Sequence, residues 1–289
     1  MAQVDLRTLQ LFELEMLKDI KRVCESNNIC FYLYSGTCLG AVRHQGFIPW
    51  DDDIDIAMPY SDFLRFLELA QEALGDRYFL QTTDTDDSFQ FGYARVRRNH
   101  TTMIREWESE EGHHGIWIDV FPLIYVGGKS DVRMKKLLIP LTNLLCASED
   151  AFGKGKDWLV SCNGRTKVAM ISGLRKLLGK RRKPFAKWIR KELYGQRRKP
   201  NMAEAWGSIT AVVPSRAFEG PPSLLSFEDD IFPVPPDYDC MLRYKYGDYM
   251  QLPPEESRHS NHGDVIIDLE HDWEEVKRIR PVSSGKEQP

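Results

Sequence analysis

Four aspartates fall within five residues of this chain, at Asp51, Asp52, Asp53 and Asp55. Like charges this close repel one another, and they are costly unless they face water or a cation. The residues that follow, 56–58, are apolar and predict a buried strand, so some of these acids are drawn towards a core. A divalent metal ion at the strand end would resolve the conflict. A solvated acidic turn is the alternative.

Asp53 and Asp55 alternate with isoleucines, and residues two apart in a strand point to the same face. We therefore expect these two carboxylates to project together, a geometry that suits Mg²⁺ or Mn²⁺. A third acid, Asp119, lies in the apolar segment GIWIDVFPL. It is expected to be a third metal ligand or a general base. The alternative is a lone buried acid that backbone N–H groups or an arginine satisfy.

Upstream, Ser35, Gly36 and Thr37 separate an apolar run from a helical pattern, which is typical of a strand, a tight turn and a helix start. Gly36 lets the backbone approach an anion, while Ser35 or Thr37 can cap the helix and donate to a phosphate. An ordinary helix cap is the alternative. Arg43 offers a bidentate contact to a phosphate, or it pairs with the acidic loop.

The segment between the two acidic strands also alternates. It places Tyr93, Arg95 and Arg97 on one face of a predicted strand. A basic strand face beside an acidic site suits a phosphate-bearing substrate. Equally, these arginines can serve only to neutralise the acids.

Near the C-terminus, residues 232–238 form a proline-rich, extended approach to a short predicted helix that Gly247 stops. Tyr246, Arg258 and His262 lie at and after this helix. We expect them to line a donor pocket, where an aromatic ring can hold a quaternary ammonium and a cation can hold a phosphate. The alternative is that these residues only pack in the last segment of the domain and bind no ligand.

Five blocks of the sequence, in order, resemble the LicD family of phosphocholine transferases, part of the nucleotidyltransferase-fold superfamily and related to the fukutin-type ribitol-phosphate transferases. The first block is YSGTCLGAVRHQGFIPWDDDIDIAM, and the others are LQLFELEMLKDIKRVCESNNI, YARVRRNHTT, GIWIDVFPL and FPVPPDYDCMLRYKYGDYMQLPPEESRHSNH. The resemblance implies paired metal acids at Asp53 and Asp55, a third acid at Asp119 and a substrate-binding arginine at Arg97. It also matches the turn at 35–37. The chain departs from its relatives at 98–100, where they more often carry a short acidic-polar turn.

The implied reaction moves a phospho-alcohol, phosphocholine first, from a CDP-linked donor such as CDP-choline to a glycan hydroxyl and releases CMP. The glycan would belong to cell-surface polysaccharide, teichoic acid or lipopolysaccharide synthesis, with an acceptor carried on a lipid. Asp119 is expected to bind the metal, and the general base stays open. Two other functions are a nucleotidyltransferase that releases pyrophosphate and a non-catalytic module that binds sugar phosphates.

The chain has 289 residues, of which 42% are apolar and 28% charged, as in a globular protein with one substantial core. Six scattered cysteines show no zinc spacing, and no secretory leader or spanning segment is evident, so we expect a cytoplasmic protein. The order of elements predicts an α+β fold, a mixed sheet flanked by helices, and the resemblance implies a nucleotidyltransferase-like one. We expect one catalytic domain over 1–285 and a frayed tail over 286–289.

Residues 130–205 are predicted to form a helical, basic insertion. Its segment 175–199 carries twelve Lys or Arg residues and one acid, Glu192. The apolar residues between these charges favour an amphipathic helix that contacts an anionic membrane, on the inner face if the protein is cytoplasmic. A solvated helix face is the alternative. A nucleic-acid partner is not expected, because no recognition motif accompanies the basic cluster.

Overall fold

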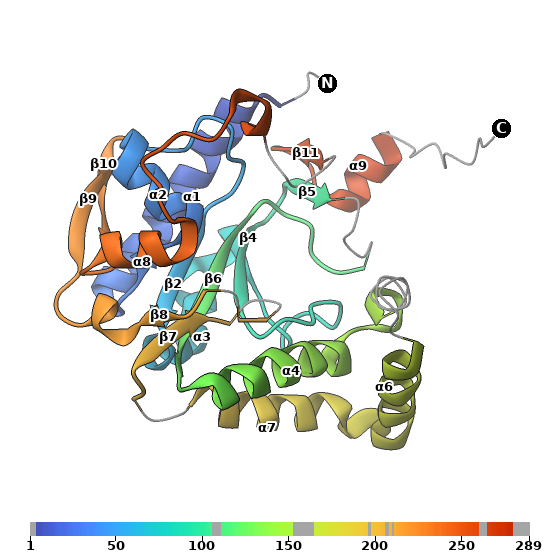
Figure 1. The fold of residues 1–289 in the computed structure, drawn as a ribbon. Coiled ribbons are helices and arrows are strands. Elements are labelled where there is room, and N and C mark those ends of the chain that lie inside the picture. Colours follow the sequence, from blue (N-terminus) through green and yellow to red (C-terminus); the bar gives the residue numbers. More distant parts are fainter. Residues whose placement is uncertain are drawn as a thin grey trace.

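The structure is a computed structural model that describes residues 4–105, 111–152, 165–195, 198–205, 208–209, 211–259 and 265–279 (Figure 1). Its helices are α1 (Leu6–Ser26), α2 (Ser35–His44), α3 (Tyr60–Leu74), α4 (Lys129–Cys146), α6 (Arg165–Leu178), α7 (Arg182–Tyr194), α8 (Tyr238–Tyr246) and α9 (Trp273–Ile279). Its strands are β1 (Tyr32–Leu33), β2 (Asp55–Pro59), β3 (Tyr78–Gln81), β4 (Ala94–Arg98), β5 (Thr102–Arg105), β6 (Trp117–Val126), β7 (Asn201–Glu204), β8 (Val213–Pro214), β9 (Ser223–Phe227), β10 (Asp230–Val234) and β11 (Val265–Asp268). Short 3-10 helices are η1 (Gly75–Arg77), η2 (Gly179–Arg181), η3 (Ser215–Phe218) and η4 (Glu255–Ser257).

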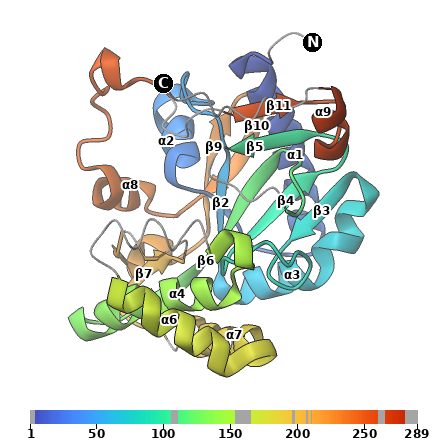
Figure 2. The ribbon, with the colours of Figure 1, turned by 90° about the vertical axis from the view of Figure 1, so that its right-hand side faces the viewer.

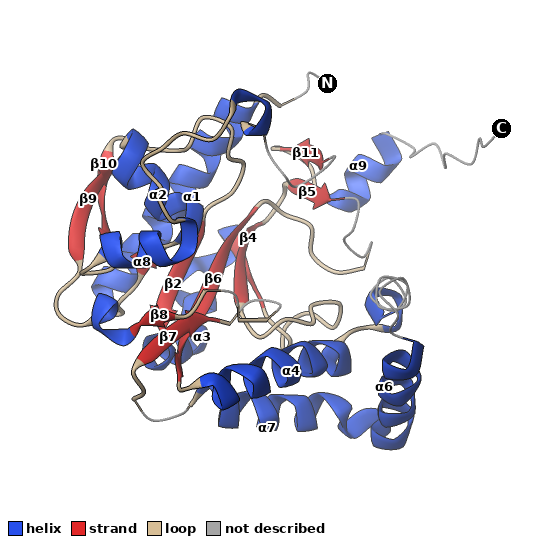
Figure 3. Cartoon of the chain, viewed as in Figure 1, coloured by secondary structure: helices blue, strands red, loops and turns tan. Residues whose placement is uncertain are grey.

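A seven-stranded mixed sheet is the centre of the fold: five strands follow the order β1-β2-β6-β4-β3, and β7 pairs with β6 and β8 off this path. β6 pairs in parallel with β2 and antiparallel with β4 and β7. The long β6 is shared along its length, because β4 pairs with residues 117–120 and β7 with residues 123–126. Strands lie between helices in Figure 3, so the predicted α+β class with a mixed sheet is confirmed.

The first helix shows why the sequence folds in this way. Its apolar residues recur at steps of three and four, and the structure buries that stripe, including Leu9, Met16, Leu17 and Ile20. The Asp5 carboxylate caps the helix by accepting the N–H of Thr8 at 3.0 Å. Full burial of each such aliphatic side chain contributes about 1.5–3 kcal/mol. The helix therefore packs firmly on the sheet and can fix the loops above it.

Helices α4, α6 and α7 form a separate layer below the sheet, as Figures 1 and 2 both show. This confirms a helical segment in the middle of the chain. The predicted range 130–205 was too long at its end, however, because 201–204 is β7 and pairs with β6 of the main sheet. The predicted tail, 286–289, lies outside the described residues.

The C-terminal part of the chain returns to the sheet. The hairpin β9–β10 and helix α8 pack beside α2, while β11 pairs antiparallel with β5 to form a second small sheet. None of the described helices is long and apolar enough to cross a membrane.

A candidate active site beside the central strands

Three neighbouring strands bring two acids and one arginine into a single row. In the parallel pair β2–β6, Asp55 stands opposite Asp119, and in the antiparallel pair β4–β6, Arg95 stands opposite Asp119. Arg95 Nε donates to Asp119 Oδ1 at 2.8 Å, and both side chains are buried. The Arg95 guanidinium also lies on the ring of Trp117, 4.3 Å from its centroid. Asp119 thus has the arginine partner that was weighed as an alternative.

Asp53 does not lie in the strand as predicted. β2 begins at Asp55, so Asp53 stays in the preceding loop with Asp51 and Asp52. In the described part of the chain, the group of three possible metal ligands whose oxygens approach within 4.8 Å of one another is Asp51, Asp52 and Asp53. The predicted set of Asp53, Asp55 and Asp119 is not gathered that closely.

Two side chains from elsewhere in the fold secure this acidic loop. Gln10 of α1 donates to the backbone carbonyl of Asp51 at 2.9 Å. Arg105 of β5 places Nη2 3.7 Å from Asp52 Oδ2 and 3.8 Å from Asp53 Oδ2. Arg105 is buried, so its charge acts on the loop with little screening by water.

Glu13 of α1 is fully buried beneath the loop. Neither of its carboxyl oxygens has a hydrogen-bond partner among the described residues. Burial raises the pKa of Glu13 well above its usual range, and the charges of Asp53 and Asp52 raise it further. Both effects disfavour a negative charge on this side chain.

Asp55 is the acid of the row whose pKa is strongly shifted by its surroundings. Burial raises its pKa well above the ordinary value, and the negative charges of Asp53 and Asp119 raise it further. Lys245 opposes this shift in the pKa of Asp55. A carboxyl in this position gains from either a proton or a cation, so the residues present fit a divalent metal ion.

The turn 35–37 holds both ends of the acidic segment. Thr37 Oγ1 accepts the backbone N–H of Asp55 at 2.8 Å. A Cβ on Gly36 would lie 2.9 Å from Asp51 Oδ2, so only glycine leaves room for that carboxylate as it lies. The expected cap was wrong: Tyr34 is the N-cap residue of α2 and no side chain caps the helix. The Thr37 hydroxyl is used by Asp55 instead.

Tyr246 of α8 reaches this turn, because its hydroxyl lies 3.2 Å from Ser35 Oγ. A buried network that sequence reasoning missed stands beside it. Lys245 Nζ lies 2.7 Å from Glu204 Oε1, and the Tyr34 hydroxyl donates to Glu204 Oε2 at 3.0 Å. Isolated Lys and Glu residues far apart in the sequence carry no signal of such a contact.

Two predicted phosphate-binding arginines meet at the end of α2. Arg43 Nη1 donates to the backbone carbonyl of Tyr249 at 2.8 Å. Burial lowers the pKa of Arg43, and the nearby positive charge of Arg258 lowers it further. Arg258 in turn lies over the ring of Trp50, 5.8 Å from its centroid. Two guanidinium groups and an aromatic ring thus gather next to the acidic loop.

Arg97 is placed differently from the prediction. It is buried, and it donates to Gln81 Oε1 at 2.6 Å and to the Gly115 carbonyl at 2.8 Å. Its neighbour Arg95 takes the position beside the acids. Arg95 was visible as part of the alternating basic face, but only strand order and register could choose between the two arginines. The remaining predicted residue, His262, lies outside the described residues.

Comparison with known proteins agrees with this geometry. Residues 28–143, which contain the turn, the acidic loop and the β2–β6–β4 row, match the family model described as LicD/FKTN/FKRP, nucleotidyltransferase domain. The chain is 28% identical over 266 residues to the lipopolysaccharide cholinephosphotransferase LicD of Haemophilus influenzae, over 91% of this chain and 97% of that protein.

Shorter matches of 63 residues link the chain to uncharacterized proteins of two Rickettsia species. The match is 44% identical to the protein of Rickettsia typhi and spans 22% of this chain and 20% of that protein. It is 43% identical to the protein of Rickettsia prowazekii and spans 22% and 23%. The domain match and the near full-length similarity both relate the chain to the LicD family.

Proposed function

We propose that this protein transfers a phospho-alcohol, phosphocholine first, from a CDP-linked donor to a glycan hydroxyl and releases CMP. The acceptor oxygen attacks the phosphorus of the phospho-alcohol, the bond from that phosphorus to CMP breaks, and CMP leaves with the bridging oxygen. The acceptor proton passes to a carboxylate of the row. The observation that carries the proposal is the in-register row of Asp55, Asp119 and Arg95 beside the turn 35–37. The name of the Haemophilus influenzae relative supports choline as the alcohol and lipopolysaccharide as the glycan.

We assign the donor's diphosphate to the arginine pair. Arg43 and Arg258 carry two positive charges that repel one another, and this repulsion adds to the larger effect of burial in lowering the pKa of Arg43. A diphosphate between them would relieve the repulsion and accept charge-assisted hydrogen bonds. Tyr246 and Trp50 stand next to the acidic loop and can offer ring faces to a quaternary ammonium. Holding donor and hydroxyl in line would supply much of the rate.

Mg²⁺ or Mn²⁺ is the cofactor that the oxygen donors suit. Asp55 is the central proposed ligand, because burial raises the pKa of its carboxyl most and the charges of Asp53 and Asp119, which a cation would offset, raise it further. Bound there, the ion would offset charge on the donor's phosphates. Asp119 keeps one oxygen on Arg95, which fixes the orientation of its carboxylate.

The test is a panel of CDP-choline, CDP-ethanolamine, CDP-ribitol and CDP-glycerol, each with Mg²⁺ and with or without a glycan acceptor. We expect acceptor-dependent release of CMP, and we expect Asp55→Asn to lower turnover by about 10²-fold or more. Asp229→Asn, an exposed acid in the β9–β10 turn, is the matched control and should keep wild-type turnover. In a parallel assay with CTP as the donor, release of pyrophosphate would indicate a nucleotidyltransferase. Binding of donor without any product would indicate a binding module.

A cytoplasmic reaction at the inner membrane face is the location that we propose. Acceptors for lipopolysaccharide are anchored in a membrane, and the name of the relative supports such an acceptor. The five described cysteines are free thiols, which is compatible with a reducing compartment. The surface that would contact the membrane lies on the helical layer of α6 and α7.

A further inference from the structure

The basic segment 175–199 is divided by its contacts into two sets of cations. One set is used inside the protein. Arg175 donates to the carbonyls of Leu144 and Ala147, and Arg190 Nη2 donates to Asn143 Oδ1 at 2.8 Å. Both arginines are buried, so they hold α6 and α7 against the end of α4.

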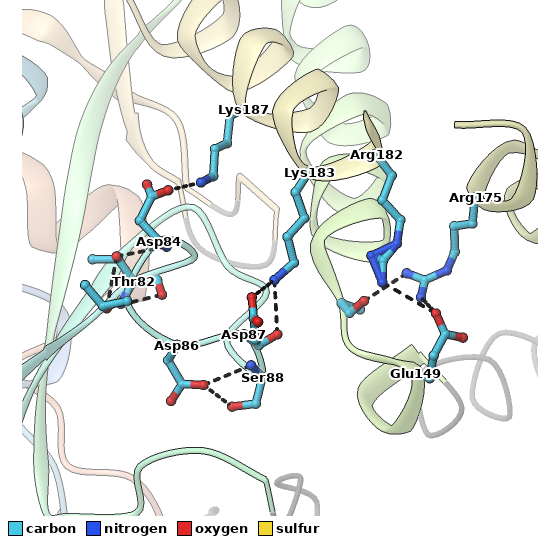
Figure 4. Close-up of polar contacts among 12 residues, drawn as sticks. Thr82, Asp84, Asp86, Asp87, Ser88, Glu149, Arg175, Arg182, Lys183 and Lys187 are labelled. Carbon is cyan, nitrogen blue, oxygen red and sulfur yellow. Dashed lines mark hydrogen bonds and ion pairs between the residues drawn. The ribbon is translucent and has the colours of Figure 1, made fainter. Parts of the chain in front are cut away.

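Two lysines on one side of α7 are also occupied. Lys183 Nζ lies 2.5 Å from Asp87 Oδ1, and Lys187 pairs with Asp84. Figure 4 shows both lysines pointing from the helix to the loop between β3 and β4. The same view shows Arg175 and Arg182 turned towards Glu149. The lysine pairs attach α7 to the loop between β3 and β4, and the Glu149 pairs tie the helical layer together.

The second set faces outwards. Lys176, Lys180, Arg181 and Lys191 are exposed and form no ion pair with any described residue. Lys176 and Lys180 line a hollow of about 830 Å³ at the corner between α6 and α7. Four cations and one carboxylate, Glu149, line this hollow, so it favours an anion.

Apolar side chains are also exposed on α6 and α7. Leu177 is 83% exposed and Trp188 is 57% exposed. The Trp188 ring stacks with that of Phe185 at a centroid distance of 6.0 Å. Arg181 precedes Phe185 by four residues and Lys191 follows Trp188 by three, so helical geometry puts these cations on the side of the rings. Exposed Trp, Phe and Leu between Lys and Arg form the pattern of a helix that lies in a membrane interface.

We propose that this surface, which we call the corner face (Lys176, Leu177, Lys180, Arg181, Phe185, Trp188 and Lys191), binds the surface of an anionic phospholipid bilayer. Lipid phosphates would meet Lys176 and Lys180 in the hollow, and Phe185 and Trp188 would enter the boundary of the acyl chains. The two nearby acids, Glu149 in the hollow and Glu192 in α7, are outnumbered by the cations. The purpose of the contact rests on the proposed function, because it would hold the enzyme on the membrane that carries the acceptor. The corner face itself stands on exposure and charge.

Flotation with vesicles tests the proposal. The full chain is mixed with phosphatidylcholine vesicles that contain either no anionic lipid or about one third phosphatidylglycerol. We expect binding to the anionic vesicles at 50 mM salt, binding that weakens steeply at 500 mM salt, and little binding to the neutral vesicles. Failure to bind anionic vesicles at 50 mM salt would overturn the proposal.

Variants locate the contact. Each cation near an anionic surface contributes about a fivefold gain in affinity, so Lys180→Glu with Arg181→Glu should weaken binding by about 25-fold or more. Phe185→Ser with Trp188→Ser should weaken it by about tenfold. The controls are Arg216→Glu, an exposed arginine in η3, and Leu224→Ser with Ile231→Ser, exposed apolar residues of the hairpin. Equal losses in controls and corner-face variants would refute the location.

Two further measurements separate this surface from the active site. Brominated acyl chains should quench tryptophan fluorescence of the wild type more than that of Trp188→Phe, while both still float. CMP release with a water-soluble acceptor should be unchanged in the corner-face variants, because none of those residues is in the site. Loss of flotation with normal soluble turnover would therefore test the membrane contact alone. Inactivity of all variants and the wild type would count against the proposed function alone.

Discussion

The ion pair between Arg95 and Asp119 gives the sharpest test of how the site is built. Arg95→Met removes the guanidinium but keeps a long apolar side chain that can still pack on the ring of Trp117. Asp119, which is only 8% exposed, is then left without its 2.8 Å donor. Breaking a buried pair in this way costs about 3–5 kcal/mol. A second estimate of this cost agrees. An unpaired, buried Asp119 can take up a proton instead, and protonating an ordinary aspartic acid at pH 7 costs about 4 kcal/mol.

Urea unfolding at pH 7 measures this free energy. We expect Arg95→Met to lose about 3–4 kcal/mol of unfolding free energy, and the double variant with Asp119→Asn to lose less than the sum of the single losses. Arg98→Met is the matched control on the same strand, since its guanidinium lies on the rings of Phe12 and Tyr78 and it should lose about 1 kcal/mol. If the two single losses simply add, or if Arg95→Met loses less than about 1 kcal/mol, the reasoning is wrong.

The same variant reports on metal binding without any activity measurement. A cation on Asp119 would replace part of the missing positive charge, so Mg²⁺ should restore part of the stability of Arg95→Met and little of that of Arg98→Met. Equal effects of Mg²⁺ on both variants would count against Asp119 as a metal ligand.

Three smaller changes test the surroundings. Thr37→Val removes the acceptor of the Asp55 N–H and should cost about 1–3 kcal/mol in urea unfolding, whereas Thr37→Ser should cost little; equal losses would contradict this. Gly40→Ala would put a Cβ 2.4 Å from a backbone carbonyl oxygen and should cost about 1–3 kcal/mol, while Gly173→Ala, with open space around it in α6, should be neutral or stabilising. Burial lowers the pKa of His113 to about 4 from 6.5, so the unfolded chain takes up a proton first as the pH falls. The contribution of His113 to the unfolding free energy should therefore be complete above pH 6.5, and the unfolding free energy should fall by up to about 3 kcal/mol towards pH 4. In His113→Gln the unfolding free energy should depend less steeply on pH.

Local patterns predicted the scaffold of the site well. The spacing of apolar residues gives α1 within two residues at each end, and the apolar runs give β2 and β6 with an acid in each. These features depend on side-chain periodicity alone, which a single segment carries by itself. The change from strand to helix near Ser35 was also predicted, although residues 35–37 are the first turn of α2 and not a separate turn before it.

Contacts between distant segments could not be predicted in this way. The choice of Arg95 over Arg97 as the partner of Asp119 depends on the register of β4 against β6. The exclusion of Asp53 from β2 depends on where pairing with β1 and β6 begins. The burial of Lys245 against Glu204 requires α8 to return to the sheet from 41 residues away. Each of these contacts is set by how distant segments are arranged, and a shift of one residue in strand register would turn the side chains to the opposite face of the sheet.

Charge compensation across the site singles out Asp55. Asp119 is held by Arg95, and Asp52 and Asp53 lie near Arg105. Burial raises the pKa of Glu13 well above its usual range, which opposes a further negative charge there. The Asp55 backbone is fixed by Thr37, while burial, and then the charges of Asp53 and Asp119, raise the pKa of its carboxyl. A site that neutralises most of its acids internally and leaves one strained carboxylate in a fixed position is arranged to receive a charge from outside the chain. For that reason Asp55, rather than the more numerous acids of the loop, is the residue on which ligand binding should depend most.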